Sequence, residues 1–519
     1  MKLACTLQVT AGVTVSSAAI PPSRASAERL GVKGPRCRGV NPTTIIANTA
    51  FNACLRLLSR DSSRRFGRIA AGPSETACQT GKQSGTLSNN KMVSERRFFK
   101  RAADRFVTIH RRRLHHNNKG AAWEDAMLDT PSQSAEDVRL QSFSVTYEYP
   151  VVFTRDAFAL GNRCLVDALS RREPCKRHRC LICVDEGVLA SLPDLASQIE
   201  NYAAAHAGSI DLVGLVRVAG GEICKNDPKT IPDLLEILSR RAIDRHSFVI
   251  AVGGGAVLDA VGYASTIFHR GVRHIRFPTT VLAQDDSGVG VKNAVNLFGL
   301  KNLVGTFAPP WAIINDSAFI DMLPPREKRA GMAEAVKVAL IRDGKFFEWL
   351  EAHSDALARF SRPHLDHLIK GCAELHMRQI RLGGDPFEIG SARPLDFGHW
   401  SAHKLEQLTK NQLNHGEAVA IGIALDTRYS VLSGRLAAGE DERVVGLLQG
   451  LGFDLWHDKL RQCDSQGLPV VLKGLADFRE HLGGELTVTL LAGIGRGVEV
   501  HEMDERIVRN CIDWLEQRA

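Results

Sequence analysis

Several features of other protein classes are missing from this chain of 519 residues. It has no run of about 18 or more consecutive apolar residues, so a membrane-spanning helix is not expected. No secretory signal is recognisable, and the twelve cysteines stand at irregular intervals, which excludes a small disulfide scaffold. With 44% hydrophobic and 24% charged residues, the composition is that of a globular protein long enough for two or three domains.

Acidic residues are scarce in the N-terminal quarter. Residues 1–120 contain 22 Lys and Arg but only 5 Asp and Glu, whereas the rest contains 44 and 53. The net positive charge is therefore confined to this quarter, and the rest of the chain is net negative. This argues against a folded body that binds nucleic acid. We expect residues 1–135 to be a basic, disordered extension or a presequence, with a later translation start at Met92 or Met127 as the alternative. The free thiols favour a cytoplasmic location. If residues 1–130 are a presequence, we expect an organelle instead.

Short β-rich runs alternate with helical patterns from Ser142 onward. The runs are Tyr149–Phe153, Cys180–Val184, Leu212–Val218, Phe248–Val252, His274–Phe277 and Ala312–Ile314. The clearest helical patterns are Thr230–Arg241, Pro325–Leu340 and His415–Leu432. This order predicts an α/β nucleotide-type domain with a parallel sheet over residues 142–318, followed by a helical domain over 319–519.

A glycine triplet follows one of these strands. Phe248–Val252 runs into Gly253, Gly254 and Gly255, and a helical pattern containing Asp259 comes next. Such a strand–glycine–helix turn lets a phosphate approach the backbone at a helix N-terminus. The triplet does not match G-x-G-x-x-G, and an ordinary tight turn is the alternative.

The segment from Arg270 to Asn302 is rich in cationic side chains and glycine. Thr279 and Thr280 end a strand, and Asp286, Lys292, Lys301 and Asn302 follow. Lysine beside glycine-rich backbone suits a phosphorylated ligand, although lysine on a loop is often only solvated.

One carboxylate and two imidazoles form a candidate metal set. Glu334 and Lys337 share a helix face, and His399 and His415 lie far along the chain. Glu, His and His are a known catalytic zinc set, but this spacing is unlike H-E-x-x-H and buried hydrogen-bonded histidines are commoner than ligands.

In combination, these segments resemble the 3-dehydroquinate synthase superfamily, or sugar-phosphate cyclases, over about Ser142–Leu515. The resemblance implies a Rossmann-like NAD-binding α/β domain and an all-α metal-binding domain. It implies NAD and Zn²⁺ (with Co²⁺ possible) as cofactors, a phosphorylated sugar as substrate, and a homodimer. No nucleic acid or membrane partner is expected.

The resemblance also assigns roles to individual residues. It implies the metal ligands Glu334, His399 and His415, and the catalytic residues Asp286, Lys292, Lys337 and His403. It implies the substrate-binding residues Arg270, Lys301, Asn302, Arg393 and Asp396. It implies the cofactor-binding residues Asp185, Glu222, Lys225, Gly253, Gly254, Gly255, Asp259, Thr279 and Thr280.

The implied reaction is an NAD- and zinc-dependent oxidation of a heptulosonate or heptulose 7-phosphate, then phosphate elimination, re-reduction and aldol closure to a carbocycle. In 3-dehydroquinate synthase this reaction belongs to aromatic amino acid biosynthesis. Four positions depart from 3-dehydroquinate synthases. Asp396 replaces an asparagine, His376 stands nearest a missing lysine, and Arg479 and Glu480 replace a lysine pair. Arg393 has the spacing of 2-epi-5-epi-valiolone synthases, which act on sedoheptulose 7-phosphate, but those enzymes lack His403. A valiolone-type cyclase and a metal-dependent polyol dehydrogenase are therefore the alternatives, and a non-enzymatic binding protein is a further one.

Overall fold

The computed structural model describes residues 4–10, 140–389, 395–481 and 484–519. Residues 4–10 and those from Ser144 onward belong to one compact unit. Residues 1–3 and 11–139, which include the rest of the extension predicted over residues 1–135, lie outside the described residues, as does Arg393.

The main sheet has seven strands in the order β1-β2-β9-β6-β5-β3-β4. They are β1 (Ala4–Thr10), β2 (Thr146–Thr154), β3 (His178–Asp185), β4 (Ile210–Val218), β5 (Phe248–Gly253), β6 (Arg273–Pro278) and β9 (Ala312–Asp316). Six strands are parallel, and β1 pairs antiparallel with β2 at one edge. All six predicted strands are confirmed, whereas β1, within the expected extension, was not predicted.

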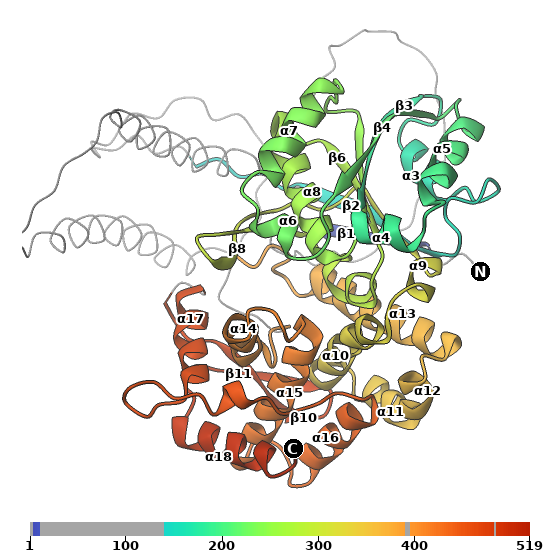
Figure 1. Ribbon diagram of the computed structural model, residues 1–519. Coiled ribbons are helices and arrows are strands. Elements are labelled where there is room, and N and C mark those ends of the chain that lie inside the picture. The colour runs from blue at the N-terminus through green and yellow to red at the C-terminus, as the bar shows by residue number, and fades with distance from the viewer. Residues whose placement is uncertain (1–3, 11–139, 390–394, 482–483) are drawn as a thin grey trace, which may run out of the picture. The chain divides into compact units, whose positions relative to one another are not determined.

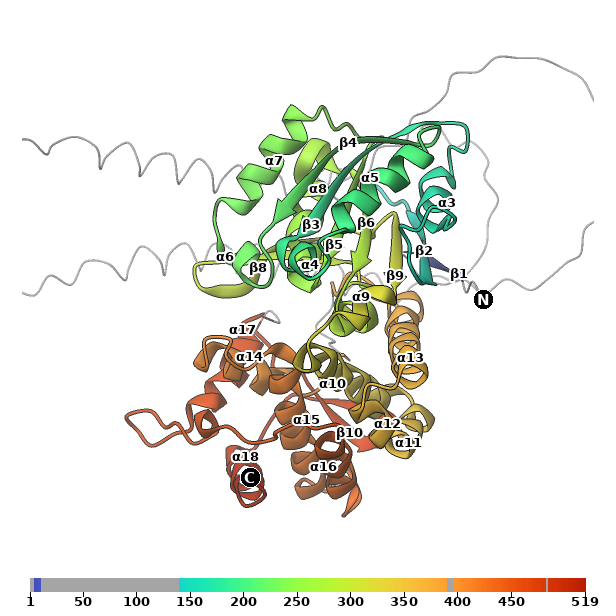
Figure 2. The same cartoon turned by 45° about the vertical axis from the view of Figure 1, so that its right-hand side comes forward.

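Helices cover both faces of this sheet (Figures 1 and 2). They are α3 (Cys164–Ser170), α4 (Glu186–Ser191), α5 (Leu195–Ala205), α6 (Ile223–Asn226), α7 (Thr230–Arg240) and α8 (Gly255–Ile267). Alternate residues of β3 face opposite sides: Ile182 packs in the cluster with α3 and α5, and Leu181 and Cys183 pack in the cluster with α7 and α8. Every residue of β5 is buried, as expected of a parallel strand covered on both faces.

The second half of the chain is mainly helical. Its helices are α9 (Ala318–Asp321), α10 (Pro325–Arg342), α11 (Gly344–Ala352), α12 (Ser354–Ala358), α13 (Arg362–Leu382), α14 (His399–Leu408), α15 (His415–Leu432), α16 (Glu440–Gly450), α17 (Lys473–His481) and α18 (Glu505–Glu516). A single large core joins α10, α13, α14, α15, α16 and α18. None of the helices in the described ranges is long and apolar enough to cross a membrane.

Two antiparallel hairpins were not predicted. One consists of β7 (Lys292–Leu297) and β8 (Leu300–Phe307), in a segment to which we assigned no strand. The other, β10 (Val488–Gly493) with β11 (Arg496–Val500), packs against α15, so the second domain is helical but not all-α. Each strand contains one lysine and β8 also contains Gly305, which obscures the strand pattern, and many of their side chains are exposed or half-buried.

Close backbone contact at two glycines sets the distance between α14 and α15. Gly398 caps α14 with φ +76°, a conformation that favours glycine. A Cβ atom on Gly422, in the middle of α15, would lie 2.0 Å from the Gly398 carbonyl oxygen. The helices can therefore cross here only because neither residue has a side chain.

We predict that Gly422→Ala lowers the free energy of unfolding by about 1–3 kcal/mol or more, because the added methyl group overlaps backbone atoms. Gly446→Ala is the matched control: Gly446 lies in the interior of α16, and a Cβ added there would have nothing within 4 Å. Alanine there should raise stability by about 0.5–1 kcal/mol through helix propensity. Denaturant unfolding of both variants tests this, and equal effects would contradict it.

Candidate active site

Helix α10 places a carboxylate and an ammonium group inside the protein. Pro325 occupies the first turn, where its missing N–H costs no hydrogen bond. Glu334 is 0% and Lys337 3% exposed, and they lie one helical turn apart with Lys337 Nζ against Glu334 Oε2. Because a buried charge must be paired, these two residues stabilise each other in the core.

Two imidazoles reach Glu334 from helices α14 and α15. His399 begins α14 and His415 begins α15, whose start is fixed by a capping box between Asn414 and Glu417. Glu334 Oε1 lies 3.4 Å from His415 Nε2 and 3.9 Å from His399 Nε2. The prediction that these three residues meet, although far apart in sequence, is confirmed.

The three side chains suit a divalent metal ion. One ligand atom from each of Glu334, His399 and His415 lies within 4.8 Å of the others. Glu334 Oε1 is buried without a hydrogen-bond partner among the described residues, which is the state of a carboxylate oxygen ready to bind a cation. His399 Nδ1 lies 3.0 Å from the Phe397 carbonyl oxygen, which turns Nε2 toward Glu334. One oxygen and two nitrogen donors are a set that binds zinc.

The charges of the set act strongly on one another. Burial raises the pKa of Glu334, but the Lys337 ammonium, His415 and His399 together more than offset this and hold that pKa below its usual value. Burial lowers the pKa of His415, whereas the Glu406 carboxylate raises it, to about 9. The carboxylates around His415 thus favour positive charge at this point, from a proton or a metal ion.

The glycine loop has the predicted strand–turn–helix form. Strand β5 ends at Gly253 and α8 begins at Gly255. A Cβ on Gly255 would lie 2.7 Å from Ser287 Oγ. Thr279 donates its backbone N–H to the Gly253 carbonyl, and Thr280 packs beside Gly254. These residues therefore lie together at the carboxyl ends of β5 and β6, where parallel sheets bind ligands.

Asp185 lies at the carboxyl end of β3, on the same side of the sheet as the carboxyl ends of β5 and β6. Its side chain caps α4 by accepting a hydrogen bond from the Gly187 N–H at 2.7 Å. A Cβ on Gly220 would meet Asp185 Oδ1 at 2.5 Å, so the chain after β4 passes directly over this carboxylate.

A second group of predicted residues meets beside the β7–β8 hairpin. Lys225 Nζ donates to Asp259 at 2.7 Å and to Asn302 Oδ1 at 2.5 Å. Glu222 accepts a hydrogen bond from the Asn296 side chain and lies 3.8 Å from Lys301 Nζ. The residues expected at the cofactor and those expected at the substrate are therefore in direct contact.

Arg276 fixes the segment that carries Asp286 and Lys292. It is fully buried in β6 and donates to the carbonyl oxygens of Gly288, Gly290 and Lys292 at 2.8–3.1 Å. Asp286 lies on a π-helical turn, η2 (Ala283–Ser287), and its Oδ1 is 2.8 Å from His376 Nδ1 of α13.

Three further predicted residues lie in surroundings that differ from one another. His403 is exposed, with its ring centroid 5.4 Å from that of His399 and 6.1 Å from that of His415. Asp396 lies three residues before His399, the first residue of α14, and its charge helps to raise the pKa of Lys337. Lys292 is mostly exposed and pairs with Glu388 at 2.5 Å.

Arg270 does not lie at the carboxyl ends of these strands. Arg270 precedes β6, whereas Thr279 and Thr280 follow it. A strand of this length spans roughly 20 Å, so Arg270 lies near the amino end of β6, opposite its carboxyl end. The role of Arg270 in substrate binding stays a prediction, because sequence proximity to Thr279 and Thr280 does not show which end of a strand a residue occupies.

Comparison with known proteins gives the family. Residues 215–330 match the 3-dehydroquinate synthase N-terminal family and residues 331–469 match the 3-dehydroquinate synthase C-terminal family. A 3-dehydroquinate synthase from Dichelobacter nodosus is 36% identical over 283 residues, which are 54% of this chain and 75% of that protein. This chain belongs to the 3-dehydroquinate synthase family of sugar-phosphate cyclases.

The cyclase is similar to members with different substrates. A 2-epi-5-epi-valiolone synthase from Streptomyces glaucescens is also 36% identical, over 54% of this chain and 71% of that protein. The solved structure of a 2-epi-5-epi-valiolone synthase from Streptomyces hygroscopicus subsp. jinggangensis 5008, with NAD⁺ and Zn²⁺ bound, has a TM-score of 0.63 and 28% identity. It covers 76% of this chain and 100% of that one. Membership of the family therefore makes this chain a phosphate-eliminating carbon–oxygen lyase. Its substrate has to be inferred from the residues of its own site.

Sequence reasoning about the cyclase missed Glu406. This side chain is 5% exposed on α14, with Oε1 2.6 Å from Lys301 Nζ and Oε2 3.4 Å from His415 Nδ1. His399, His403 and Glu406 have the spacing i, i+4, i+7, which places them on one helix face. That spacing is the signal from which Glu406 could have been found.

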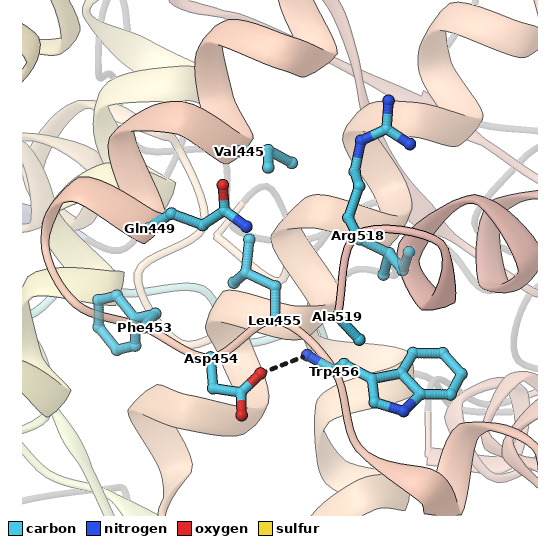
Figure 3. A pocket seen from close by; sticks show the side chains of 9 residues that line it. Val445, Gln449, Phe453, Asp454, Leu455, Trp456, Arg518 and Ala519 are labelled. Atoms are coloured by element: carbon cyan, nitrogen blue, oxygen red, sulfur yellow. Dashed lines mark hydrogen bonds between the residues drawn. The ribbon is translucent and has the colours of Figure 1, made fainter.

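A hollow elsewhere in the cyclase is not a second candidate. Figure 3 shows a pocket of about 80 Å³ between α16 and the C-terminal residues. It is lined by Val445, Gln449, Phe453, Asp454, Leu455, Trp456, Leu515, Arg518 and Ala519. Ligand pockets usually measure about 300–1,000 Å³, so this one is too small for a sugar phosphate.

Asp426 supports the metal-ligand helix from inside the core. Its oxygens accept hydrogen bonds from Trp400 Nε1 at 2.8 Å and from the Gly398 N–H at 2.9 Å. Burial raises the pKa of Asp426 from 3.8 to about 7, although both hydrogen bonds lower it. The folded protein therefore holds this proton to a higher pH than the unfolded chain does.

We predict that the stability contributed by Asp426 falls as pH rises from about 4 to 7, because in this window its carboxyl group binds fewer protons in the unfolded chain than in the folded one. The contribution of Asp426 to that fall is up to about 4 kcal/mol. Asp426→Asn should lack this component, measured as the free energy of urea unfolding at several pH values. A variant with the same pH dependence as the parent would contradict the prediction.

Proposed function

We propose that this cyclase binds one Zn²⁺ and NAD and converts a heptulosonate or heptulose 7-phosphate into a carbocycle with release of inorganic phosphate. The observation that carries the proposal is the meeting of Glu334, His399 and His415 beside buried Lys337. The glycine loop at Gly253–Gly255 and the lysines of the β7–β8 region support it.

The residues of the chain suit the separate needs of this reaction. When bound, zinc would polarise a substrate hydroxyl oxygen, and NAD would accept a hydride and return it. Glu334, His399 and His415 would hold the metal, and the N–H groups at the start of α8 would bind the pyrophosphate of the dinucleotide. The Lys337 ammonium would stabilise negative charge that develops on the substrate beside the metal.

Other predicted residues would bind the ends of the two ligands. Lys301 and Asn302 would receive the substrate phosphate, with Lys292, Asp286 and His403 orienting it. The dinucleotide would also contact Asp185, Glu222, Lys225, Asp259, Thr279 and Thr280. Arg393 stays a predicted substrate residue, and the homodimer, the cytoplasmic location and the limits of the two domains also stay predictions.

One observation favours a heptulose over a heptulosonate. The lysines of the site are already matched by acids of the chain: Lys337 by Glu334, Lys301 by Glu406 and Lys292 by Glu388. Asp396 adds a further carboxylate near Lys337. A substrate carboxylate would meet like charges here, so sedoheptulose 7-phosphate fits this environment better and a role in aromatic biosynthesis fits it less well.

We predict that the protein, loaded with Zn²⁺ and NAD, releases phosphate from sedoheptulose 7-phosphate with a kcat/KM at least about tenfold above that for 3-deoxy-arabino-heptulosonate 7-phosphate, a difference of ~1.4 kcal/mol. NADH should not accumulate, because the hydride returns to the substrate. A phosphate-release assay and NADH absorbance test this. Absence of phosphate from both sugars, or NADH build-up with an unphosphorylated polyol, would refute the cyclase assignment of this substrate class.

We also predict that Glu334→Gln lowers phosphate release by at least about 100-fold and reduces bound zinc, because it removes the anionic ligand. Glu351→Gln is the matched control, since it changes only an exposed ion pair with Arg443. Zinc content by atomic absorption and activity are measured for both. A Glu334→Gln protein with full zinc content and activity would remove the metal assignment.

A further inference from the structure

The carboxylate of Glu406 faces two partners at once. Oε1 lies 2.6 Å from Lys301 Nζ, and Oε2 lies 3.4 Å from His415 Nδ1. The side chain is 5% exposed, so water does not replace these partners. A buried carboxylate is retained only where cationic or donor groups compensate for its desolvation.

His415 lies between two carboxylates. Its Nε2 faces Glu334 Oε1 at 3.4 Å, and its Nδ1 faces Glu406 Oε2 at the same distance. A metal-binding imidazole usually donates its other N–H to a carboxylate or carbonyl, which fixes the ring and makes the ligand nitrogen more basic. His399 has a neutral support of this kind, the Phe397 carbonyl at 3.0 Å, whereas the group facing His415 Nδ1 is the charged Glu406 carboxylate, at an ion-pair distance without a formed hydrogen bond.

The Lys301 contact crosses from one part of the fold to the other. Lys301 lies on β8, whose hairpin packs against the α/β domain through Asn293 and Gly262 of α8. Glu406 lies on α14 of the helical domain, which also carries His399. One carboxylate therefore links the hairpin that we assign to phosphate binding with the helices that hold the metal ligands.

We propose that Glu406 is a positioning residue: it orients His415 for the metal and docks the β7–β8 hairpin onto α14 through Lys301. This inference rests on the zinc site of the proposed function. Glu406 itself touches neither substrate nor metal. It acts through His415 on one side and through Lys301 on the other.

The decisive variant is Glu406→Gln, which keeps the size of the side chain and removes its charge. We expect it to bind Zn²⁺ about 10–100-fold more weakly than the parent in competition with a chromophoric chelator. The visible absorption spectrum of the Co²⁺-loaded protein should also change, because the field of His415 changes. Asp477→Asn is the matched control. It removes a carboxylate that pairs at 2.9 Å with Lys404, a residue of α14 like Glu406, and that does not contact His415. It should leave both readouts unchanged.

A double variant separates the two partners of Glu406. Glu406→Gln alone leaves the Lys301 charge uncompensated, whereas Glu406→Gln with Lys301→Met removes the ion pair as a whole and is the variant to use if the single one does not fold. Zinc binding should stay weak in the double variant, because His415 still lacks its carboxylate. Lys301→Met alone should keep the zinc affinity within about threefold, since His415 keeps its partner.

Four results would overturn the inference. Parent-like zinc affinity and Co²⁺ spectrum in Glu406→Gln would show that His415 does not depend on Glu406. Recovery of affinity in the double variant would assign the effect to the Lys301 charge. Two zinc ions per parent chain and one in Glu406→Gln would make Glu406 a ligand, together with His403 and His415. A parent that binds no zinc would refute this inference and the proposed function together, which the first three results would not do.

Discussion

The burial of one carboxylate constrains much of this structure. Glu334 lies in the middle of α10 with 0% exposure, between alanine and valine residues that pack in the core. An ionised carboxylate in such surroundings is unfavourable unless opposite charges and donors surround it. Lys337 supplies the first partner from the same helix, and α14 and α15 must come close enough to supply the others.

Glycine makes that close approach possible. Gly422 of α15 faces the backbone of Gly398, and Gly416 of α15 faces the backbone of Ala330 on α10, where a Cβ would lie 2.0 Å from the carbonyl oxygen. These contacts bring the starts of α14 and α15 against α10. The metal-ligand set therefore depends on residues that have no side chain as much as on the ligands themselves.

Carboxylates of the chain already compensate the cations around the site. Each lysine of the described site region pairs with a carboxylate: Lys225 with Asp259, Lys292 with Glu388, Lys301 with Glu406 and Lys337 with Glu334. Such pairing holds the long lysine side chains in place before a ligand arrives, which lowers the entropy lost on binding. A phosphate group then competes with carboxylates that already hold the lysines.

Residue order alone is enough to predict the local elements and the chemistry of the residues. Six parallel strands and helices α7, α10 and α15 follow from periodicity, and the strand–glycine–helix turn and the Glu, His, His set follow from residue type and order. Packing in three dimensions was needed to establish that β7 and β8 form a hairpin, that Arg270 lies near the amino end of β6, and that Glu406 lies between Lys301 and His415. Periodicity reports which face a residue occupies within its own element, whereas the meeting of side chains about 100 residues apart depends on how those elements pack.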